Sequence, residues 1–453
     1  MKYEAGGKYE VRSTKYELGR VTGQVEGQDN ETNGSAGSYF VLRTSYLAYI
    51  AYPSSLVLRS ANAVQTYSTA RELREQDPAV AVLIPRWARR ESAFAAIGAH
   101  HLLRLPFNAF SHLWRTTAWS YLERSWFACR VAVWLARRRG DRPTVIYVRD
   151  AICAAWFGAG LARLVGARLI YECHALEAWN PSRARSPFAR PLVRLIDSLA
   201  IRRADRVVAL TEGFRAWLDR VGLKGREVTA TIPDAYDDSC WFSRDQAGAR
   251  GAVGLAPTAF VVTYAGLTWA YRGLDRLVRA FAALQVEVPD SVLVLVGGRP
   301  VERAEMTALA EELGIAEKVH LPGQRPQAEV VEWVAAADVL VVPGVINGLN
   351  ASPLKMFEYA AMDRPIVADD IPAIREILGD DGARYFQAGD VAALQAALAA
   401  IQRDPTAAAA VAARVRERVA AFTYRARAAT ILELAATVRA AATQATTQGT
   451  EKR

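Results

Sequence analysis

The sequence predicts an α/β protein with two Rossmann-like domains, each built on a parallel sheet. Short apolar segments alternate with helical segments from residue 46 to residue 233, and the same alternation begins again at residue 260. This pattern is typical of parallel sheets that helices cover on both faces. The length of 453 residues supports the division, because it corresponds to two or three domains of roughly 150 residues each.

The first domain is predicted at residues 39–245, after a disordered tail at residues 1–38 that is polar and lacks apolar periodicity. Buried strands are expected where apolar residues cluster, at residues 46–52, 80–84, 144–148, 168–172, 204–211 and 227–233. Helical patterns occupy residues 60–75, most of residues 93–139, and residues 212–221.

The second domain is predicted at residues 255–425, after a linker at residues 239–257. Its strands are expected at residues 260–266, 291–298, 318–323, 338–344 and 365–368. Helices are expected between these strands, and an Ala-rich helical segment follows at residues 391–442. Residues 426–453 are predicted to form a C-terminal helix and a polar tail. Because parallel sheets bind ligands at the carboxyl ends of their strands, the two sheets are expected to face a central cleft.

Composition favours a globular protein with an anionic partner. Charged residues make up 23% of the chain, which suits a soluble fold. The net charge of +9 is concentrated between residues 81 and 225, where 24 Lys and Arg face 10 Asp and Glu. Arginine-rich segments at residues 85–90, 136–140 and 182–194 indicate either a solvated basic face or contact with an anionic membrane or lipid phosphate. No nucleic-acid-binding module is recognisable, so nucleic acid is not an expected partner.

Cysteine usage and hydropathy predict a cytoplasmic location. The four cysteines show no CxxC spacing, and no signal peptide is recognisable, which favours a reduced compartment. No apolar run approaches the roughly 20 residues that span a bilayer. We therefore expect a cytoplasmic protein with peripheral contact at the inner membrane face.

The segment from Gly344 to Leu378 has the features of an anion site. An apolar strand ends at Gly344, a loop with Gly348 follows, and Ser352 then precedes a proline as a predicted helix N-cap. Free backbone N–H groups and the positive end of a helix dipole favour a phosphate there. Lys355 adds a positive charge, and Glu358 is suited to accept hydrogen bonds from sugar hydroxyls. Together they predict a nucleotide-diphosphate pocket; an ordinary strand–loop–helix unit is the alternative.

The motif SPLKMFEYAAMDRPIVA in this segment resembles the donor site of family 4 retaining glycosyltransferases, which have the GT-B fold. The family shows Glu, seven residues and Glu; here Glu358 holds the second position and Asn350 the first. The resemblance implies that Glu358 holds the ribose of a nucleotide sugar and that Asn350 orients the sugar. It also implies donor contacts from the remaining members of this loop and helix: Gly348, Ser352, Leu354 and Lys355. The family needs no metal.

Three further strand ends of the second domain match donor-binding loops of this family. In TYAGLTWAYRGLDRL, Arg272 stands before a glycine where a basic residue contacts the donor diphosphate, and Gly266 forms the preceding turn. Many members have an arginine right after that first glycine, where this chain has Leu267. The resemblance implies that the loops at Gly298 and Gln324 approach the nucleotide. Alternatively, both loops are plain turns that contact no ligand.

The first domain offers three candidates at strand ends. His174 follows the strand RLIYEC, and the resemblance implies that it contacts the transferred sugar and acts as a catalytic residue. Arg149 follows TVIYV and is expected either to contact an acceptor or donor phosphate or to form a structural salt bridge. Asn62 lies where the family has a glycine-rich loop and can replace it with a side-chain contact. A zinc site at Cys173 and His174 is rejected, because no further ligands stand at suitable spacing.

The resemblance implies a retaining glycosyltransferase that moves a sugar from a nucleotide-diphosphate sugar to a glycan or lipid-linked acceptor, in cell-surface polysaccharide or glycolipid synthesis. No nucleophile is evident, so front-face displacement is implied by the resemblance. Two alternatives stay open. A nucleotide-sugar epimerase of GT-B architecture would carry additional carboxylates as acid and base. The other alternative is an inactive partner subunit that binds a nucleotide sugar. Loss of activity would explain why Asn350 and Leu267 replace the residues that are usual in the family.

Overall fold

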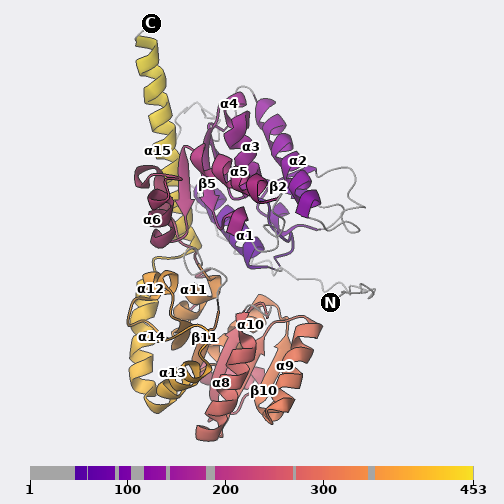
Figure 1. Ribbon diagram of the computed structural model, residues 1–453, viewed down its shortest axis with the longest axis vertical. Helices are drawn as coiled ribbons and strands as arrows, with labels where there is room; N and C mark the ends of the chain where they lie inside the picture. Colours follow the sequence, from indigo (N-terminus) through magenta and orange to yellow (C-terminus); the bar gives the residue numbers. More distant parts are fainter. Residues whose placement is uncertain are drawn as a thin grey trace, which may run out of the picture. The chain divides into compact units, whose positions relative to one another are not determined.

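The computed structural model describes residues 46–58, 60–86, 91–103, 117–138, 143–179, 189–268, 272–344 and 352–451 (Figure 1). Among these residues, thirteen strands form two separate sheets in which every strand pair is parallel. Two parallel α/β domains were expected from the alternation of apolar and helical segments, and the structure confirms them. The predicted tail at residues 1–38 lies outside the described residues.

The first sheet has the strand order β3-β2-β1-β4-β5-β6-β7, which is the doubly wound Rossmann order. Its strands are β1 Leu47–Ile50, β2 Ala81–Arg86, β3 His100–Leu103, β4 Val145–Val148, β5 Arg168–Cys173, β6 Arg206–Ala209 and β7 Thr229–Thr231. The helices that follow these strands are α1 Ala61–Gln76, α2 Thr117–Ala136, α3 Ala151–Trp156, α4 Ala162–Leu164, α5 Ala189–Arg202 and α6 Glu212–Arg220.

The second sheet has the order β10-β9-β8-β11-β12-β13. Its strands are β8 Phe260–Ala265, β9 Ser291–Val296, β10 Val319–Gly323, β11 Val339–Val342, β12 Ile366–Asp369 and β13 Arg384–Phe386. Its helices are α7 Gln246–Val253, α8 Leu274–Glu287, α9 Pro300–Glu312, α10 Gln327–Ala335, α11 Leu354–Ala361, α12 Pro372–Leu378, α13 Val391–Arg403 and α14 Pro405–Val419.

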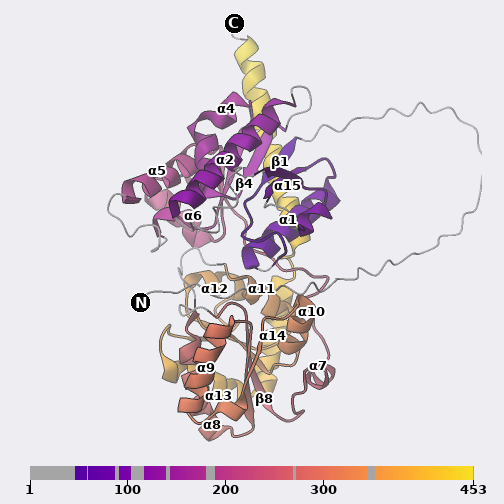
Figure 2. The same ribbon diagram turned by 90° about the vertical axis from the view of Figure 1, so that its right-hand side faces the viewer.

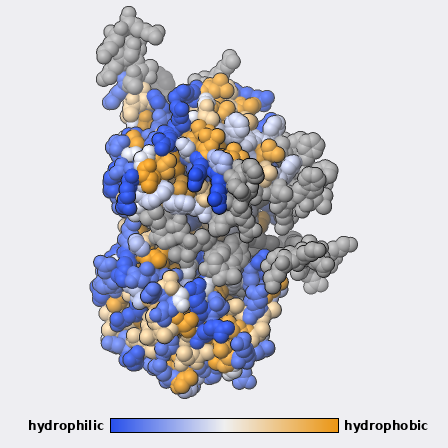
Figure 3. All heavy atoms as spheres, in the orientation of Figure 1, coloured by the Kyte–Doolittle hydropathy of each residue, from blue (hydrophilic) through white to orange (hydrophobic). Residues whose placement is uncertain are grey.

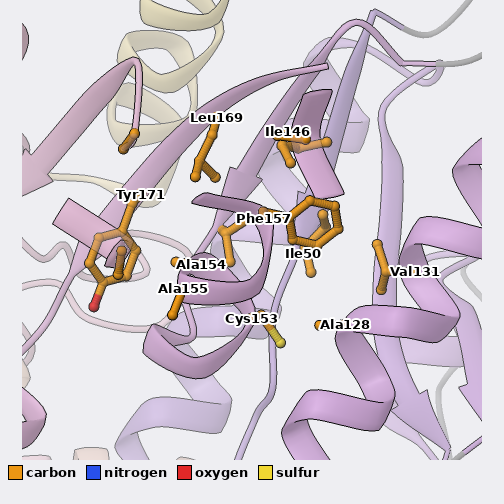
Figure 4. Close-up of a cluster of buried hydrophobic side chains, with 14 of the residues drawn as sticks. Ile50, Ala128, Val131, Ile146, Cys153, Ala154, Ala155, Phe157, Leu169 and Tyr171 are labelled. Atoms are coloured by element: carbon orange, nitrogen blue, oxygen red, sulfur yellow. The ribbon is translucent and has the colours of Figure 1, made fainter. Parts of the chain in front are cut away.

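Alternate residues of the first sheet fill two cores. Ile50 and Ile146 point to one face, where they pack with Phe157 and with helices α2 and α3 (Figure 4). Tyr49 and Tyr147, their neighbours along the same strands, point to the other face and stack with ring centroids 5.8 Å apart. Strands buried on both faces read as continuous apolar runs, which is why these segments were visible in the sequence.

The C-terminal helix α15, Tyr424–Glu451, completes the second core of the first domain. Its buried apolar residues in this core recur on one helical face, and they are Ala428, Ile431, Ala435 and Val438. They pack against strands of the first sheet, and α15 lies alongside that sheet in both ribbon views (Figures 1 and 2). After the second domain, the chain therefore returns to the first domain, and α15 forms part of its core. A local pattern of small residues predicts this helix but not the sheet that it covers.

Two local elements were not predicted. Residues 93–139 were expected to be mostly helical, yet His100–Leu103 forms the edge strand β3, which pairs with β2. The linker predicted at residues 239–257 contains α7, whose buried Arg250 forms an ion pair of 2.5 Å with Asp338. Both elements are short, and neighbours distant in sequence stabilise them.

Candidate functional site

The loops after β8 and β11 start at the same edge of the second sheet. β8 and β11 are neighbours in the sheet, and the chain continues from them toward opposite sides, to β9 and to β12. Such a switch point is where open α/β sheets bind ligands. The loop after β8 carries Gly266 and Arg272, and the loop after β11 leads to Ser352 and Lys355. The sequence-predicted donor residues of both loops are thus brought to one place.

Glycines allow these loops to approach one another closely. Gly266 has φ +145°, and a Cβ there would lie 2.7 Å from Nζ of Lys355. Gly297 has φ +121°, and a Cβ there would lie 2.1 Å from the carbonyl oxygen of Gly266. Gly298, with φ +84°, leaves room for the Thr268 hydroxyl, which donates to Glu302 at 2.7 Å. At these three positions a side chain would come too close to neighbouring atoms, and the backbone has a conformation that residues other than glycine rarely adopt.

Two positive groups occupy this switch point. The ammonium of Lys355, in the first turn of α11, lies 3.7 Å from the ring centroid of Tyr264. The guanidinium of Arg272 donates to the carbonyl of Gly344 at 3.2 Å, which ties the β8 loop to the end of β11. The hydroxyl of Tyr359 accepts the N–H of Ala265 at 2.7 Å and so anchors α11 to β8. The first turn of α11, which carries Lys355, is therefore held close to β8 and to Arg272.

The charge balance of this cluster favours an anion. Burial lowers the pKa of Lys355 well below its usual value, and the Arg272 guanidinium lowers it further, while Glu358 opposes both. Burial raises the pKa of Glu358 to about 7, and Lys355 opposes the shift. A diphosphate would stabilise the ammonium, and the carboxylate is placed one turn along the helix, where a ligand hydroxyl can donate to it.

Ser352 does not cap α11 as predicted. Pro353 is the N-cap residue and α11 begins at Leu354. The Ser352 hydroxyl instead accepts the backbone N–H of Asp234 at 3.3 Å. A bond to the end of the first domain thus replaces the local capping bond. Gly348 and Asn350 lie outside the described residues.

Gln324 directly follows the carboxyl end of β10, and Asn62 lies in the first turn of α1, which follows β1 after a short loop. Gln324 is exposed directly after Gly323, whose φ is +77°. The Asn62 side chain accepts the N–H of Ser54 at 2.9 Å, and Ser60 caps α1 through the N–H of Ala63. Asn62 is exposed, and this bond joins the first turn of α1 to the loop that follows β1.

A buried ionic network lies at the carboxyl ends of β4 and β5. Glu172 is completely buried, and its Oε1 accepts from Nε of Arg149 at 2.9 Å. Its Oε2 accepts from Tyr147 and forms an ion pair of 2.7 Å with Arg427 of α15. Although burial alone would raise the pKa of Glu172, the guanidiniums of Arg149 and Arg427 hold it well below the usual range. The carboxylate is therefore ionised and links β5 to the C-terminal helix.

Arg149 connects several side chains of this network. Its Nη1 donates to the hydroxyls of Tyr49 at 3.1 Å and Thr66 at 2.8 Å, and its Nη2 lies 2.8 Å from Nε2 of His174. The side chain is 3% exposed. Of the two roles expected for Arg149, phosphate contact or structural salt bridge, the geometry corresponds to the salt bridge.

His174 lies beside Glu172, with its Nε2 2.5 Å from Oε1 of that carboxylate. Its side chain remains 26% exposed, so one part of the ring is accessible while Nε2 is engaged. Cys173 points the other way into the core, as expected, and burial raises its pKa to about 12.

Asp234, Tyr424 and Arg427 were not identified from the sequence. Arg427 donates to the carbonyl of Ile232 at 2.9 Å, beside the segment where the chain leaves the first domain. Asp234 and Tyr424 are 3% and 2% exposed, and within the described residues Oδ1 of Asp234 and the Tyr424 hydroxyl lack hydrogen-bond partners. Burial raises the pKa of both groups. No local motif marks these residues, because their neighbours are distant in sequence.

Two kinds of feature are absent from the described residues. No group of three or more His, Cys, Asp and Glu side chains is arranged to hold a metal ion. Within the same part of the chain, no helix combines the length and the apolar character needed to cross a bilayer.

Each of the two domains matches a known family model. A family model described as "Glycosyl transferase 4-like domain" matches residues 62–233, and one described as "Glycosyl transferases group 1" matches residues 259–404. The chain belongs to the group 1 glycosyltransferases of family 4. The two matches fall on the first and second sheets respectively.

Curated relatives of this chain are moderately similar to it in sequence. The D-inositol 3-phosphate glycosyltransferase of Nocardia farcinica is 31% identical over 47% of this chain and 48% of its own length. The 2-deoxystreptamine glucosyltransferase of Streptomyces kanamyceticus is 26% identical over 64% of this chain and 76% of its own. The chain spans about half the length of several inositol 3-phosphate glycosyltransferases that it matches.

Solved structures share the GT-B fold of this chain. Sucrose-phosphate synthase from Thermosynechococcus elongatus superposes with a TM-score of 0.72 at 19% identity, covering 87% of this chain and 99% of that one. HepE from Anabaena in complex with UDP-glucose superposes with a TM-score of 0.65 at 17% identity, covering 86% and 99%. At these identities the likeness concerns the fold.

Proposed function

We propose that this protein transfers a glycosyl group from a nucleoside-diphosphate sugar to a hydroxyl of an acceptor, with retention of the anomeric configuration. The observation that carries the proposal is the cluster of Arg272, Lys355 and the first turn of α11 at the switch point of the second sheet. Departure of a nucleoside diphosphate develops negative charge, and preorganised cations and helix N–H groups stabilise it. The proposal includes no metal, because these groups supply the positive charge.

The remaining residues take supporting roles in this proposal. Glu358, on the helix that carries Lys355, accepts hydrogen bonds from the ribose. His174 contacts the transferred sugar, as Asn350 does from the donor loop. The acceptor hydroxyl attacks the anomeric carbon on the face that the diphosphate leaves, and a phosphate oxygen takes the hydroxyl proton. The new glycosidic bond then has the configuration of the bond that breaks.

The names of related proteins narrow the first substrates to test. A HepE structure contains UDP-glucose, so this donor is the first choice. Relatives are named for D-inositol 3-phosphate and 2-deoxystreptamine, so these two compounds are the first acceptors. Glycan and lipid-linked acceptors of cell-surface polysaccharide synthesis form the second set.

Transfer is tested by incubating the full chain with UDP-glucose and each acceptor and analysing the product by NMR. We expect release of UDP together with an α-linked product from the α-linked donor. A β-linked product would overturn retention. Nucleotide binding without transfer to any acceptor would favour the inactive partner subunit, and a changed sugar in the recovered nucleotide sugar would favour an epimerase.

We also propose that the first domain contacts an anionic membrane. Leu192 and Leu195 of α5 are each 53% exposed, and Arg194 lies between them in sequence. Exposed apolar residues also occur on α2, where Leu122 is 57% exposed. Hydrophobic and strongly hydrophilic residues are mixed over the upper domain in Figure 3. An apolar surface with arginines is suited to the interface of an anionic bilayer; much of the basic sequence at residues 85–90 and 182–194 lies outside the described residues.

Vesicle sedimentation tests this contact. The full chain should sediment with vesicles that contain phosphatidylglycerol, and the double variant Leu192→Ser, Leu195→Ser should sediment less. Equal sedimentation of both proteins would contradict a role for this surface of α5.

A further inference from the structure

A pocket of about 280 Å³ opens at the amino ends of β2 and β3. Four side chains with polar groups line it, and we call the site the basic pocket: Arg74, His100, Trp134 and Arg138. The candidate site of the first domain lies beyond the carboxyl ends of β4 and β5. In a parallel sheet these are opposite edges, so the basic pocket is separate from the donor and acceptor residues described above.

Three different elements position the basic groups. Arg74 lies in the last turn of α1 and donates from Nη1 to the carbonyl of Val80 at 3.1 Å. His100 begins β3, and its ring centroid lies 5.0 Å from that of Trp134. The guanidinium of Arg138, just after α2, lies 4.0 Å from the centroid of the Trp134 ring. Trp134 therefore serves as a common support for His100 and Arg138.

The basic pocket has an excess of positive charge. Among its lining residues in the described part of the chain there is no carboxylate. Asp77, three residues after Arg74, accepts the N–H of Ala79 instead and does not line the pocket. Burial lowers the pKa of His100, and the charges of Arg138 and Arg74 lower it further. Positive groups gathered around a concave surface attract an anion and are stabilised by it.

We propose that the basic pocket binds a phosphate monoester. Guanidinium groups match phosphate oxygens in geometry and charge, and Arg74 and Arg138 present two of them from different elements. The volume is close to the lower limit of about 300 Å³ for small-molecule sites, which suits a phosphate with a small organic group. Pro78 and Pro143 supply apolar walls for that group. The phosphate belongs either to a soluble metabolite or to a lipid headgroup.

This inference does not depend on the proposed glycosyl transfer. The donor site also attracts phosphate, so the two sites must be separated experimentally. Calorimetric titration with inorganic phosphate is therefore carried out on the full chain in the presence of saturating UDP. Arg138→Gln removes one guanidinium from the basic pocket, and Arg137→Gln is the matched control, because Arg137 is an exposed neighbour that does not line it.

We expect phosphate to bind in the presence of UDP, with affinity reduced about tenfold by Arg138→Gln, as for loss of one charged hydrogen bond, and unchanged by Arg137→Gln. Absence of phosphate binding, or equal weakening by both substitutions, would overturn the proposal. Even if UDP fails to bind, the comparison of the two variants still decides it.

Two further probes identify the source of the phosphate. Glycerol 3-phosphate represents a soluble monoester, and phosphatidylcholine vesicles with phosphatidic acid represent a lipid headgroup. Binding of glycerol 3-phosphate that is sensitive to Arg138→Gln supports a soluble ligand. Vesicle sedimentation with the same sensitivity supports a lipid. If neither probe responds to Arg138→Gln, the basic pocket is not a phosphate monoester site.

Discussion

Arg427 of α15 and Glu172 of β5 form a buried ion pair, with Nη2 of the arginine 2.7 Å from Oε2 of the carboxylate. The two side chains are 3% and 0% exposed. Glu172 also contacts His174. The family resemblance implies that His174 contacts the transferred sugar. The last helix of the chain is thus connected, through one carboxylate, to the candidate site of the first domain.

Replacing Arg427 should destabilise the fold strongly. Arg427→Met leaves Glu172 buried with one fewer positive partner, and breaking such a pair costs about 3–5 kcal/mol. Chemical denaturation followed by circular dichroism measures the change. Arg425→Ala is the matched control, because Arg425 is 73% exposed and lies 3.8 Å from its carboxylate partner; its loss should cost less than about 1 kcal/mol. Similar losses for both variants would contradict a special contribution of the buried Arg427–Glu172 pair to stability.

The stability contributed by Glu172 should depend on pH in a defined direction. Its folded-state pKa lies well below the usual value of 4.5, so ionised Glu172 stabilises the fold above pH 4.5. This contribution is lost as pH falls through the folded-state pKa. The difference in unfolding free energy between wild type and Arg427→Met should therefore shrink below pH 4.5. A difference that stays constant on acidification would show that the ion pair is not its source.

Glu358 should have the opposite effect. Its folded-state pKa is about 7, above the usual value of 4.5, so ionisation of Glu358 opposes folding. The penalty is absent below pH 4.5 and increases until pH exceeds 7. Glu358→Gln should therefore be more stable than wild type at about pH 8 and equal to it at about pH 4, as measured by denaturant unfolding. A stability difference independent of pH would contradict the burial of an ionisable Glu358.

Diphosphate recognition should depend on Arg272 and Lys355. Arg272→Ala and Lys355→Met should each weaken UDP binding by about tenfold to a hundredfold, because charged hydrogen bonds contribute about 1.5–3 kcal/mol. Binding of uridine, which lacks the diphosphate, should change little. The control is Arg279→Ala, an exposed arginine on α8, which should leave UDP affinity unchanged. Equal losses for UDP and uridine would indicate a general structural defect.

Gly266 should be required for the position of Lys355. In Gly266→Ala the new methyl group would lie 2.7 Å from Nζ of Lys355 and must displace it. UDP affinity should fall even in folded protein. Gly222→Ala is the control, since Gly222 also has a positive φ, of +65°, but a Cβ there meets nothing within 4 Å. If both variants bind UDP as wild type does, the Gly266 contact does not define the site.

The sequence was sufficient for the architecture because parallel strands buried on both faces appear as apolar runs such as LAYI and VLVV. It was insufficient for β3, which consists of HHLL and is stabilised by pairing with β2. The same limit applies to α7, whose Arg250 depends on Asp338 of a distant segment. Local patterns carry no information about such long-range partners.

Some residues of the candidate site could likewise be predicted from the sequence, and others could not. Arg272, Lys355 and Glu358 belong to continuous motifs, so their loops could be recognised and the switch point brings them together. Ser352 was expected as a local cap, but its hydroxyl accepts the N–H of Asp234. Arg427 could not be assigned, because its role depends on the return of α15 to the first sheet.

The donor site is best tested by calorimetric titration with UDP, GDP and ADP, comparing wild type with Glu358→Ala. We expect one nucleotide to bind selectively to the wild type and Glu358→Ala to lose most of this affinity. Absence of binding by all three nucleotides, or binding that Glu358→Ala leaves unchanged, would contradict the assignment of the donor site.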